Sequence, residues 1–191
     1  MITVIAEHSV NLELLPIHSN VLDLGCRGFE FTDQLRALGH SVYPVDIDTL
    51  ETRKNYHRIA ISHRNGFAKV QIFPNDPQST RILPDTNQDA KGDLIEMMTI
   101  AEFSKRNGVE KWDLIKIDIE GEEYKILESA QHPMATQVSV EFHEHTDRKI
   151  GKERLDDLLL RLSKFYVIYN QNWEARHGAG FNYWHILLIK R

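Results

Sequence analysis

The sequence predicts an α/β fold that is doubly wound, with a mostly parallel sheet and an antiparallel hairpin at its C-terminal end. The first observation is the pattern of residues 20–48, in which a short apolar run, a periodic segment and a second apolar run follow one another. The second is that strand-like and helix-like segments go on alternating, which is typical of right-handed crossovers between parallel strands. The third is that the last two strand-like segments, 165–170 and 182–190, are separated by residues without helical periodicity, which favours a hairpin.

Local patterns and turn residues predict the elements of the first half of the chain. Its expected elements are a strand at 20–25, a helix ending near Gly39, a strand at 41–48, a short exposed helix at 49–56, and strands at 56–62 and 67–73. Asn65-Gly66, between the last two strands, suits a tight hairpin turn. Residues 74–92 are rich in Pro, Asp, Asn, Gln, Ser and Thr, and we expect a long loop that closes over a site.

The second half begins with a strand that runs into a helix over residues 95–108, with Thr99 as the N-cap and Gly108 as the stop. The remaining elements are a strand at 112–119, a helix at 122–130, a strand at 137–143, a helix at 153–164 and the two closing strands. No internal repeat or linker divides the chain. We therefore expect one domain over residues 1–191.

Composition limits the classes of function. The chain has 41% apolar and 27% charged residues and a formal net charge of −5, which argues against nucleic-acid binding because no basic stripe is present. Cys26 has no partner for an internal disulfide, and the N-terminus lacks the basic start and apolar run of a signal peptide. No run is long enough for a membrane helix. These features predict a cytoplasmic enzyme or binding protein without membrane insertion.

The turn after the first strand, residues 23–31 (DLGCRGFEF), is the expected ligand cradle, because ligands of open α/β sheets bind beyond the carboxyl ends of the strands. Gly25 and Gly28 allow a ligand to approach the backbone closely. Asp46 lies at the end of the second strand, where an acidic residue can accept hydrogen bonds from ribose hydroxyls. Asp23 would repel a pyrophosphate but can accept a hydrogen bond from an amino group, and the full dinucleotide glycine pattern is missing. The pattern favours S-adenosylmethionine over NAD, and the alternative is a tight turn with no ligand.

Charged side chains occur at alternate positions near the ends of two strands that we expect to be parallel neighbours. They are Lys116, Asp118 and Glu120 on the first strand, and Glu141, His143 and His145 on the second. Because alternate residues share a face, each set lies together at the cofactor edge of the sheet. Charges on interior strands are costly unless paired or bound, so this cluster indicates a site.

Three chemistries remain open for this cluster. An imidazole or carboxylate can act as general base toward a substrate hydroxyl, and His143 suits neutral pH best. Alternatively, Asp118, Glu120 and His143 can hold a divalent ion such as Mn or Mg. The third interpretation is a salt-bridged strand end, in which Lys116 pairs with Glu141. We prefer the general base as the simplest.

Residues 113–123, DLIKIDIEGEE, resemble the hallmark of the FkbM-type methyltransferases, a branch of the class I S-adenosylmethionine-dependent fold. The similarity extends over about residues 20–145 and includes VLDLG, VDID, IAIS, MTIAEF and SVEFHEH. The glycine turn departs from the family pattern D-x-G-A-N-x-G, because Cys26 replaces Ala, Arg27 replaces Asn, and the second glycine comes one position early.

The resemblance implies a seven-stranded Rossmann-like sheet and S-adenosylmethionine as the cofactor. It implies that Asp23, Gly25 and Gly28, with Cys26 between them, contact the methionine part, that Asp46 contacts the ribose, and that Ile61 and Ser62 lie near the adenine. The implied activity is methyl transfer, and we expect a small-molecule hydroxyl, such as that of a sugar or glycolipid precursor, as acceptor. The alternatives are a non-catalytic S-adenosylmethionine-binding module, which the altered turn favours, and a nicotinamide-dependent oxidoreductase.

Overall fold

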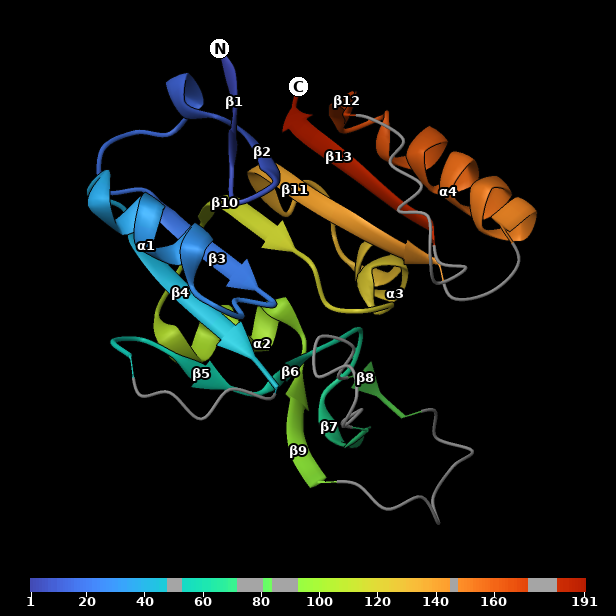
Figure 1. The fold of residues 1–191 in the computed structure, drawn as a ribbon, viewed down its shortest axis with the longest axis horizontal. Coiled ribbons are helices and arrows are strands. Elements are labelled where there is room, and N and C mark those ends of the chain that lie inside the picture. The colour runs from blue at the N-terminus through green and yellow to red at the C-terminus, as the bar shows by residue number, and fades with distance from the viewer. Residues whose placement is uncertain (48–52, 72–80, 84–92, 145–147, 172–181) are drawn as a thin grey trace.

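The computed structural model describes residues 1–47, 53–71, 81–83, 93–144, 148–171 and 182–191 (Figure 1). A seven-stranded sheet forms its centre, in the order β12-β13-β11-β10-β3-β4-β5. The strands, in sheet order, are β12 (Tyr166–Gln171), β13 (Asn182–Lys190), β11 (Ala135–Glu144), β10 (Trp112–Ile117), β3 (Asn20–Leu24), β4 (Ser41–Asp46) and β5 (His57–Arg58). The expected seven-stranded sheet is therefore present.

The sheet is mixed. Parallel pairings join β11, β10, β3, β4 and β5, whereas β13 runs antiparallel to both β11 and β12. The C-terminal hairpin predicted from the missing helical periodicity is thus confirmed, and the other strands are parallel as expected. All carboxyl ends of the parallel strands meet at one edge, which is where a ligand site is expected.

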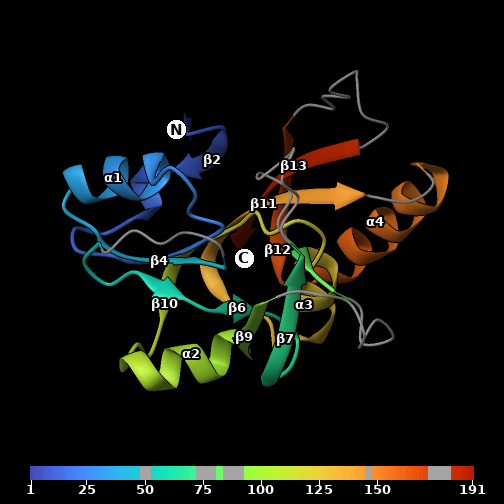
Figure 2. The same ribbon diagram turned by 60° about the horizontal axis from the view of Figure 1, so that its bottom comes forward.

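Layers of apolar side chains cover both faces of the sheet because neighbouring strand residues point in opposite directions. Val21 and Leu114 pack into one cluster with α1 (Glu30–Ala37), whereas Leu22 and Ile115 pack into another cluster on the opposite face. The helices of that second cluster are α2 (Ile100–Asn107), α3 (Glu123–Ser129) and α4 (Arg148–Leu162). Figure 2 shows α1 and α2 on opposite sides of the strands.

Helix α2 begins and ends at the residues predicted for it. Thr99 is the N-cap and its hydroxyl accepts a hydrogen bond from the Glu102 amide at 3.2 Å, while Gly108 adopts the left-handed conformation at the C-terminus. Among the described residues, no helix combines the length and the apolar character that crossing a bilayer requires.

A second, four-stranded sheet corrects one prediction. Its order is β6 (Ala60–Ile61), β9 (Asp93–Met98), β7 (Gly66–Gln71) and β8 (Arg81–Ile82). The expected hairpin between 56–62 and 67–73 is wrong, because β9 lies between β6 and β7. The inward side chains of β7 and β9 pack into an apolar cluster of their own. In addition, β9 is longer than the two-residue β6, so it can pair with more of β7.

Three further expectations need correction or lie outside the described residues. The expected strand 56–62 is divided between β5 and β6, which belong to different sheets. Of the helix expected at 49–56, residues 49–52 lie outside the described part of the chain, and residues 53–56 are not helical but contain a turn at 54–55. Of the loop expected at 74–92, only residues 81–83 are described, and they contain β8.

An N-terminal hairpin was not anticipated from the sequence. Strands β1 (Ile2–Ile5) and β2 (His8–Asn11) pair antiparallel, and a short 3₁₀ turn, η1 (Leu12–Leu14), follows them. The hairpin packs on β11 and β13, and the buried side chain of Gln137 exchanges two hydrogen bonds with the backbone of Asn11, at 2.8 and 2.9 Å. The hairpin therefore lies on the central sheet next to α1.

Candidate active site

A cavity of ≈ 350 Å³ lies at the carboxyl ends of the parallel strands. Its lining comes from the ends of β3 and β4, from the turns that follow β3, β4 and β10, from β6, β8 and β11, and from the N-terminal hairpin. Six of the residues predicted from the sequence as site residues line the cavity, namely Gly25, Asp46, Ile61, Asp118, Glu120 and His143. One cavity thus brings together three of the residues expected to bind the cofactor and all three expected to be catalytic.

Gly25 is required by the close approach of two loops. Its φ is +78°, and a Cβ at this position would lie 1.8 Å from the carbonyl oxygen of Asp118. The Gly25 amide donates to the Val45 carbonyl at 2.9 Å, and the Gly25 carbonyl accepts from the Lys116 ammonium at 2.5 Å. The turn after β3 is therefore fixed between β4 and β10, and its backbone faces the cavity.

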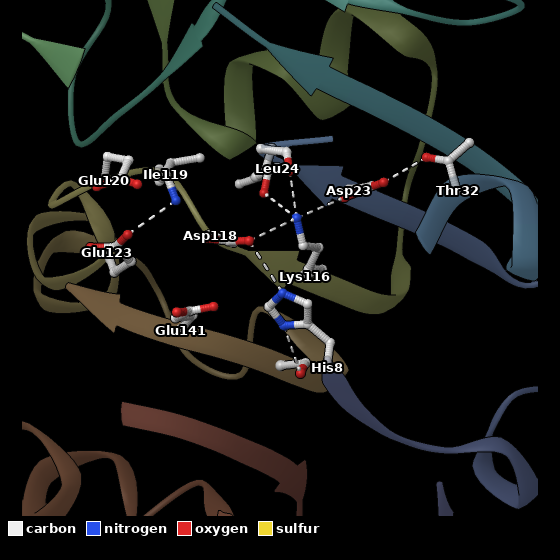
Figure 3. A network of polar contacts seen from close by, with 12 residues as sticks. His8, Asp23, Leu24, Thr32, Lys116, Asp118, Ile119, Glu120, Glu123 and Glu141 are labelled. Carbon is white, nitrogen blue, oxygen red and sulfur yellow. Dashed lines mark hydrogen bonds and ion pairs between the residues drawn. The ribbon is translucent and has the colours of Figure 1, made fainter. Parts of the chain in front are cut away.

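Asp23 lies away from the cavity. Its carboxylate accepts a hydrogen bond from the Thr32 hydroxyl at 2.5 Å and pairs with the Lys116 ammonium at 3.3 Å, and the residue is fully buried. Figure 3 shows Lys116 between Asp23 and Asp118. The described structure therefore does not bring Asp23 to the cavity that Asp46 and Gly25 line, and it gives this acid a structural partner instead.

Lys116 pairs with Asp23 and Asp118, both at 3.3 Å, and the pairing with Glu141 that the salt-bridge interpretation assumed is not the one observed. Burial alone would lower the pKa of the Lys116 ammonium, but the carboxylates of Asp118 and Asp23 outweigh burial and hold that pKa above its ordinary range. The ammonium also donates to the Leu24 carbonyl. A permanent positive charge thus ties the ends of β3 and β10 together.

Cys26 and Gly28 are the other two turn residues expected at the cofactor. Burial, followed by the charges of Asp23 and Asp46, raises the pKa of the Cys26 thiol far above its ordinary value, so the thiol stays protonated. Cys26 lines a second cavity, described below, and not the first. Gly28 has φ +74° and abuts the Glu30 carboxylate, and it lines neither of these two cavities.

The nucleoside end of the expected cofactor site has three candidate residues. Asp46 ends β4 and lines the cavity, and one of its carboxylate oxygens accepts from the Ile47 amide at 2.7 Å. Ile61 also lines the cavity. Ser62 does not, because its buried hydroxyl donates to Glu122 at 2.5 Å. The contacts of these residues with a nucleoside stay a prediction.

The catalytic residues expected from strand parity lie around His143. Its Nε2 is 3.6 Å from Asp118 Oδ1, 3.8 Å from Glu120 Oε1 and 3.9 Å from Glu141 Oε1. Parity accounts for the placement of Asp118, but Glu120 reaches the cluster through a turn, since β10 ends at Ile117 and Glu120 has φ 56°. His145, the third member expected on β11, lies outside the described residues.

Glu123 organises the cluster, and sequence reasoning did not single it out. This fully buried carboxylate accepts hydrogen bonds from the Ile119 and Gly121 amides at 3.0 Å each and lies 2.8 Å from His143 Nδ1. It thereby fixes both the turn that carries Glu120 and the imidazole ring. The available signal was an acid in the first turn of a helix directly after Gly121, where free amides need acceptors.

The protonation states within the cluster differ from those expected. Burial alone would lower the pKa of His143, but Glu123, Asp118 and Glu120 outweigh burial and raise it to about 10. Burial raises the pKa of Glu120 to about 7, with Asp118, Glu123 and Glu141 adding to the shift and His143 opposing it. At neutral pH His143 is therefore an imidazolium, and Glu120 is the group that exchanges a proton.

Asp118 stays ionised at the junction of this cluster with Lys116. Burial would raise the pKa of Asp118, but Lys116, His8 and His143 outweigh burial and hold the pKa well below its usual range. His8 Nε2 lies 3.3 Å from Asp118 Oδ2. A dashed line marks this contact in Figure 3. A carboxylate at this point is available as an acceptor at any pH at which the protein works.

The cavity as a whole is acidic. The carboxylates in its lining come from Glu7, Asp46, Asp118, Glu120, Glu122 and Glu141, whereas the positive charges come from Arg27 and His143. This balance favours a ligand that carries positive charge and hydroxyl groups. A sulfonium with an amino group and a ribose has these features, so the lining fits S-adenosylmethionine.

The metal alternative fits less well. The imidazolium of His143 must lose a proton before it can ligate an ion, which weakens metal binding by the set Asp118, Glu120 and His143. The described residues do bring ligand atoms of His8, Asp118 and Glu141 within 4.8 Å of one another. Asp118 is already paired with Lys116 there, and we assign no ion to the group.

The sequence model of the methyltransferase FkbM domain matches residues 25–166. No curated protein sequence matches the chain. Among solved structures, a TehB-like SAM-dependent methyltransferase from Corynebacterium glutamicum is similar, with a TM-score of 0.40 and 13% identity, over 94% of this chain and 84% of the other. A precorrin-6y C5,15-methyltransferase from Geobacter metallireducens has a TM-score of 0.41 and 10% identity, over 94% and 85% of the two chains.

Proposed function

Because the chain belongs to the family of FkbM methyltransferase domains, which depend on S-adenosylmethionine, we propose that it methylates a hydroxyl group of a small molecule, such as a sugar or glycolipid precursor. The observation that supports this most directly is the single cavity lined by both Asp46 and Glu120. A residue suited to a ribose and a residue suited to proton transfer therefore face the same space.

S-adenosylmethionine, when bound, supplies a methyl carbon on a positively charged sulfur, and transfer breaks the carbon–sulfur bond with its electron pair remaining on sulfur. Asp46 would hold the ribose hydroxyls, and the backbone of the Gly25 turn would lie against the methionine part. Asp118, which stays ionised, would accept hydrogen bonds from a positively charged amino group. Holding the reactants in line supplies most of the acceleration.

Glu120 is the general base in this proposal. A carboxylate with a pKa of about 7 is half ionised near neutral pH, and it is basic enough to take the acceptor's hydroxyl proton as the new carbon–oxygen bond forms. His143 was the base preferred from the sequence, but its pKa of about 10 keeps it protonated. As an imidazolium, His143 would stabilise the ionised form of Glu120, which is the form that accepts the proton of the hydroxyl.

Calorimetry with S-adenosylhomocysteine tests the cofactor part of the proposal. We expect the wild-type protein to bind it and Asp46→Ala to bind it at least tenfold more weakly, because two ribose hydrogen bonds are lost. Asp157→Ala on the exposed surface of α4 is the matched control and should bind as wild type. If the wild-type protein does not bind the ligand, the proposal is wrong.

Product formation separates an enzyme from a non-catalytic binder. Release of S-adenosylhomocysteine is measured from S-adenosylmethionine with a panel of hydroxylated acceptors. We expect release with at least one acceptor and its loss in Glu120→Gln. A protein that binds the cofactor tightly but releases no product with any acceptor would instead be the binding module that the altered turn favours.

A further inference from the structure

The tip of the N-terminal hairpin has an unfavourable backbone for the residues it contains. Ile5 pairs with His8, so Ala6 and Glu7 form a two-residue turn, and their φ values are 44° and 68°. Turns of this kind favour Asn and Gly, because other residues are strained at positive φ. Strain of this kind is found at functional sites, where the surrounding structure holds it in place.

The surroundings of His8 hold the tip in place. His8 is buried, and its Nε2 lies 3.3 Å from Asp118 while its Nδ1 lies 3.5 Å from the Ser139 hydroxyl. The ring also contacts Phe31 and His185 edge to face. With the two hydrogen bonds of Gln137 to β2, these contacts fix the tip against the end of β10.

The hairpin tip lines a second cavity, of ≈ 440 Å³, and its Glu7 also lines the first. The second cavity lies between the tip, the turn after β3 and the start of α1. Its lining is Ala6, Glu7, His8, Gly25, Cys26, Arg27, Glu30, Phe31, Gln34, Lys116 and Asp118. Glu7, Gly25, Arg27 and Asp118 line both cavities, so the two spaces adjoin at the point where the cofactor turn meets the catalytic turn.

We propose that the second cavity binds the methyl acceptor and that the hairpin tip, with Glu7, is the element that selects it. This inference rests on the proposed function. The residues suited to a nucleoside, Asp46 and Ile61, line only the first cavity, which leaves the second for the body of the acceptor. Glu120 also lines only the first cavity, so the reacting hydroxyl of the acceptor would extend past Asp118, which lines both cavities, to reach this base. The tip is a surface turn at the edge of both cavities, and turns of this kind commonly carry binding residues on a rigid scaffold.

The charges of the second cavity indicate the class of acceptor. Carboxylates of Glu7, Glu30 and Asp118 face it, against the guanidinium of Arg27 and the ammonium of Lys116. Lys116 and Asp118 already pair with each other, which leaves two acids, Glu7 and Glu30, against Arg27. A hydroxyl-rich acceptor that is uncharged or carries an amine is therefore favoured, and one that carries phosphate or carboxylate is disfavoured.

A crystal structure with S-adenosylhomocysteine is the first test. We expect the ligand in the first cavity, with the second cavity open beside the position of the sulfur. A methionine end that fills the second cavity would overturn the assignment. Complete failure to bind S-adenosylhomocysteine would instead contradict the proposed function, and this inference would fall with it.

Ligand-detected NMR on the S-adenosylhomocysteine complex tests the acceptor class, with glucose, glucosamine and glucose 6-phosphate as probes. We expect binding of glucose and glucosamine at millimolar concentration and at least tenfold weaker binding of the phosphate ester. Preference for the phosphate ester, or no binding by either of the other two, would overturn the class.

Glu7→Gly separates acceptor selection from folding. Glycine relieves the backbone strain while it removes the carboxylate, so we expect a melting temperature no lower than that of wild type and at least tenfold weaker glucosamine binding. Because Glu7 lines both cavities, binding of S-adenosylhomocysteine should weaken as well, but clearly less than binding of glucosamine. Asn55→Gly, at another residue with positive φ that lines neither cavity, is the control and should leave both affinities unchanged. Unchanged glucosamine binding in Glu7→Gly, or equal weakening of both ligands, would overturn the proposal.

Discussion

Two buried charged clusters lie side by side at the carboxyl edge of the sheet, and they differ in access to the cavity. The first joins Asp23, Thr32 and Lys116, and the second joins Glu120, Glu123 and His143, with Asp118 shared between them. In the first, the enclosed cluster, Asp23 and Thr32 are fully buried and line neither cavity, and Lys116 lines only the second cavity. In the other cluster, Glu120 and His143 line the first cavity.

The difference teaches that residue type does not separate a structural cluster from a chemical one. Both contain acids and a cation near the ends of strands, and both satisfy the sequence criteria for a site. Only in the cluster that faces the cavity is a group, Glu120, moved to a pKa near neutrality. In the enclosed cluster the pKa of Lys116 is held above its ordinary range, so its ammonium stays charged.

Removing the cation of the enclosed cluster should have the largest effect. Lys116→Met leaves the buried carboxylate of Asp23 without its ion pair and releases the carbonyls of Leu24 and Gly25. We expect the free energy of unfolding to fall by roughly 3–5 kcal/mol, as measured by urea denaturation. A loss below 1 kcal/mol would mean that this cluster is not what holds β3 and β10 together.

Glu120→Gln should affect rate and leave folding intact. We expect turnover to fall by roughly 100-fold or more, because the proton acceptor is lost. In the wild-type protein the rate should rise with pH through about 7, as Glu120 ionises, and the variant should lack this rise. Turnover is measured as release of S-adenosylhomocysteine from pH 5.5 to 9. A pH profile shared by both proteins would exclude Glu120 as the base.

Glu123→Gln should change the pH dependence of stability. The pKa of His143 is raised to about 10 in the folded protein, so the stabilisation from its charge is complete below its unfolded pKa of about 6.5 and is lost as pH rises toward 10. Urea denaturation at pH 6 and pH 10 should show a decline of a few kcal/mol in wild type. A variant that lacks the Glu123 charge should show a smaller decline, and an equal one would contradict the assigned cause.

Thr32→Val should have the smallest effect. The hydroxyl donates to Asp23 inside the enclosed cluster, and its loss removes one hydrogen bond while Lys116 remains. We expect a loss of about 1–2 kcal/mol in the free energy of unfolding and no change in the pH profile of turnover. A shifted profile would show that the two clusters are coupled through Asp118.

Much of the fold could be predicted because its signals are local. Thr99 and Gly108 mark the ends of α2. The alternate positions of Lys116 and Asp118 predicted that their side chains meet at the edge of the sheet. Pairing between distant segments carries no such signal. Asn65-Gly66 satisfied the rule for a hairpin, but the side chain of Asn65 instead accepts from the Thr99 amide, and β9 pairs with β7.

The chemistry of the candidate site was less accessible than its location. His143 was expected to titrate near neutrality because the sequence does not reveal that Glu123, twenty residues away, would lie 2.8 Å from its ring. Glu120 depends on a turn with positive φ that strand parity cannot describe. The hairpin of residues 2–11 could not be predicted from the sequence, because two four-residue strands are too short to show an alternating pattern.

The contact between Gly25 and the carbonyl of Asp118 leaves no room for even one methyl group. The loop that would cradle the methyl donor and the loop that bears the proton acceptor therefore cannot be re-spaced independently. Any attempt to enlarge the acceptor range of this protein by redesigning either loop would disturb both. The hairpin tip also lines the cavities but takes no part in the contact between Gly25 and Asp118, so it is the segment whose length can be changed by redesign.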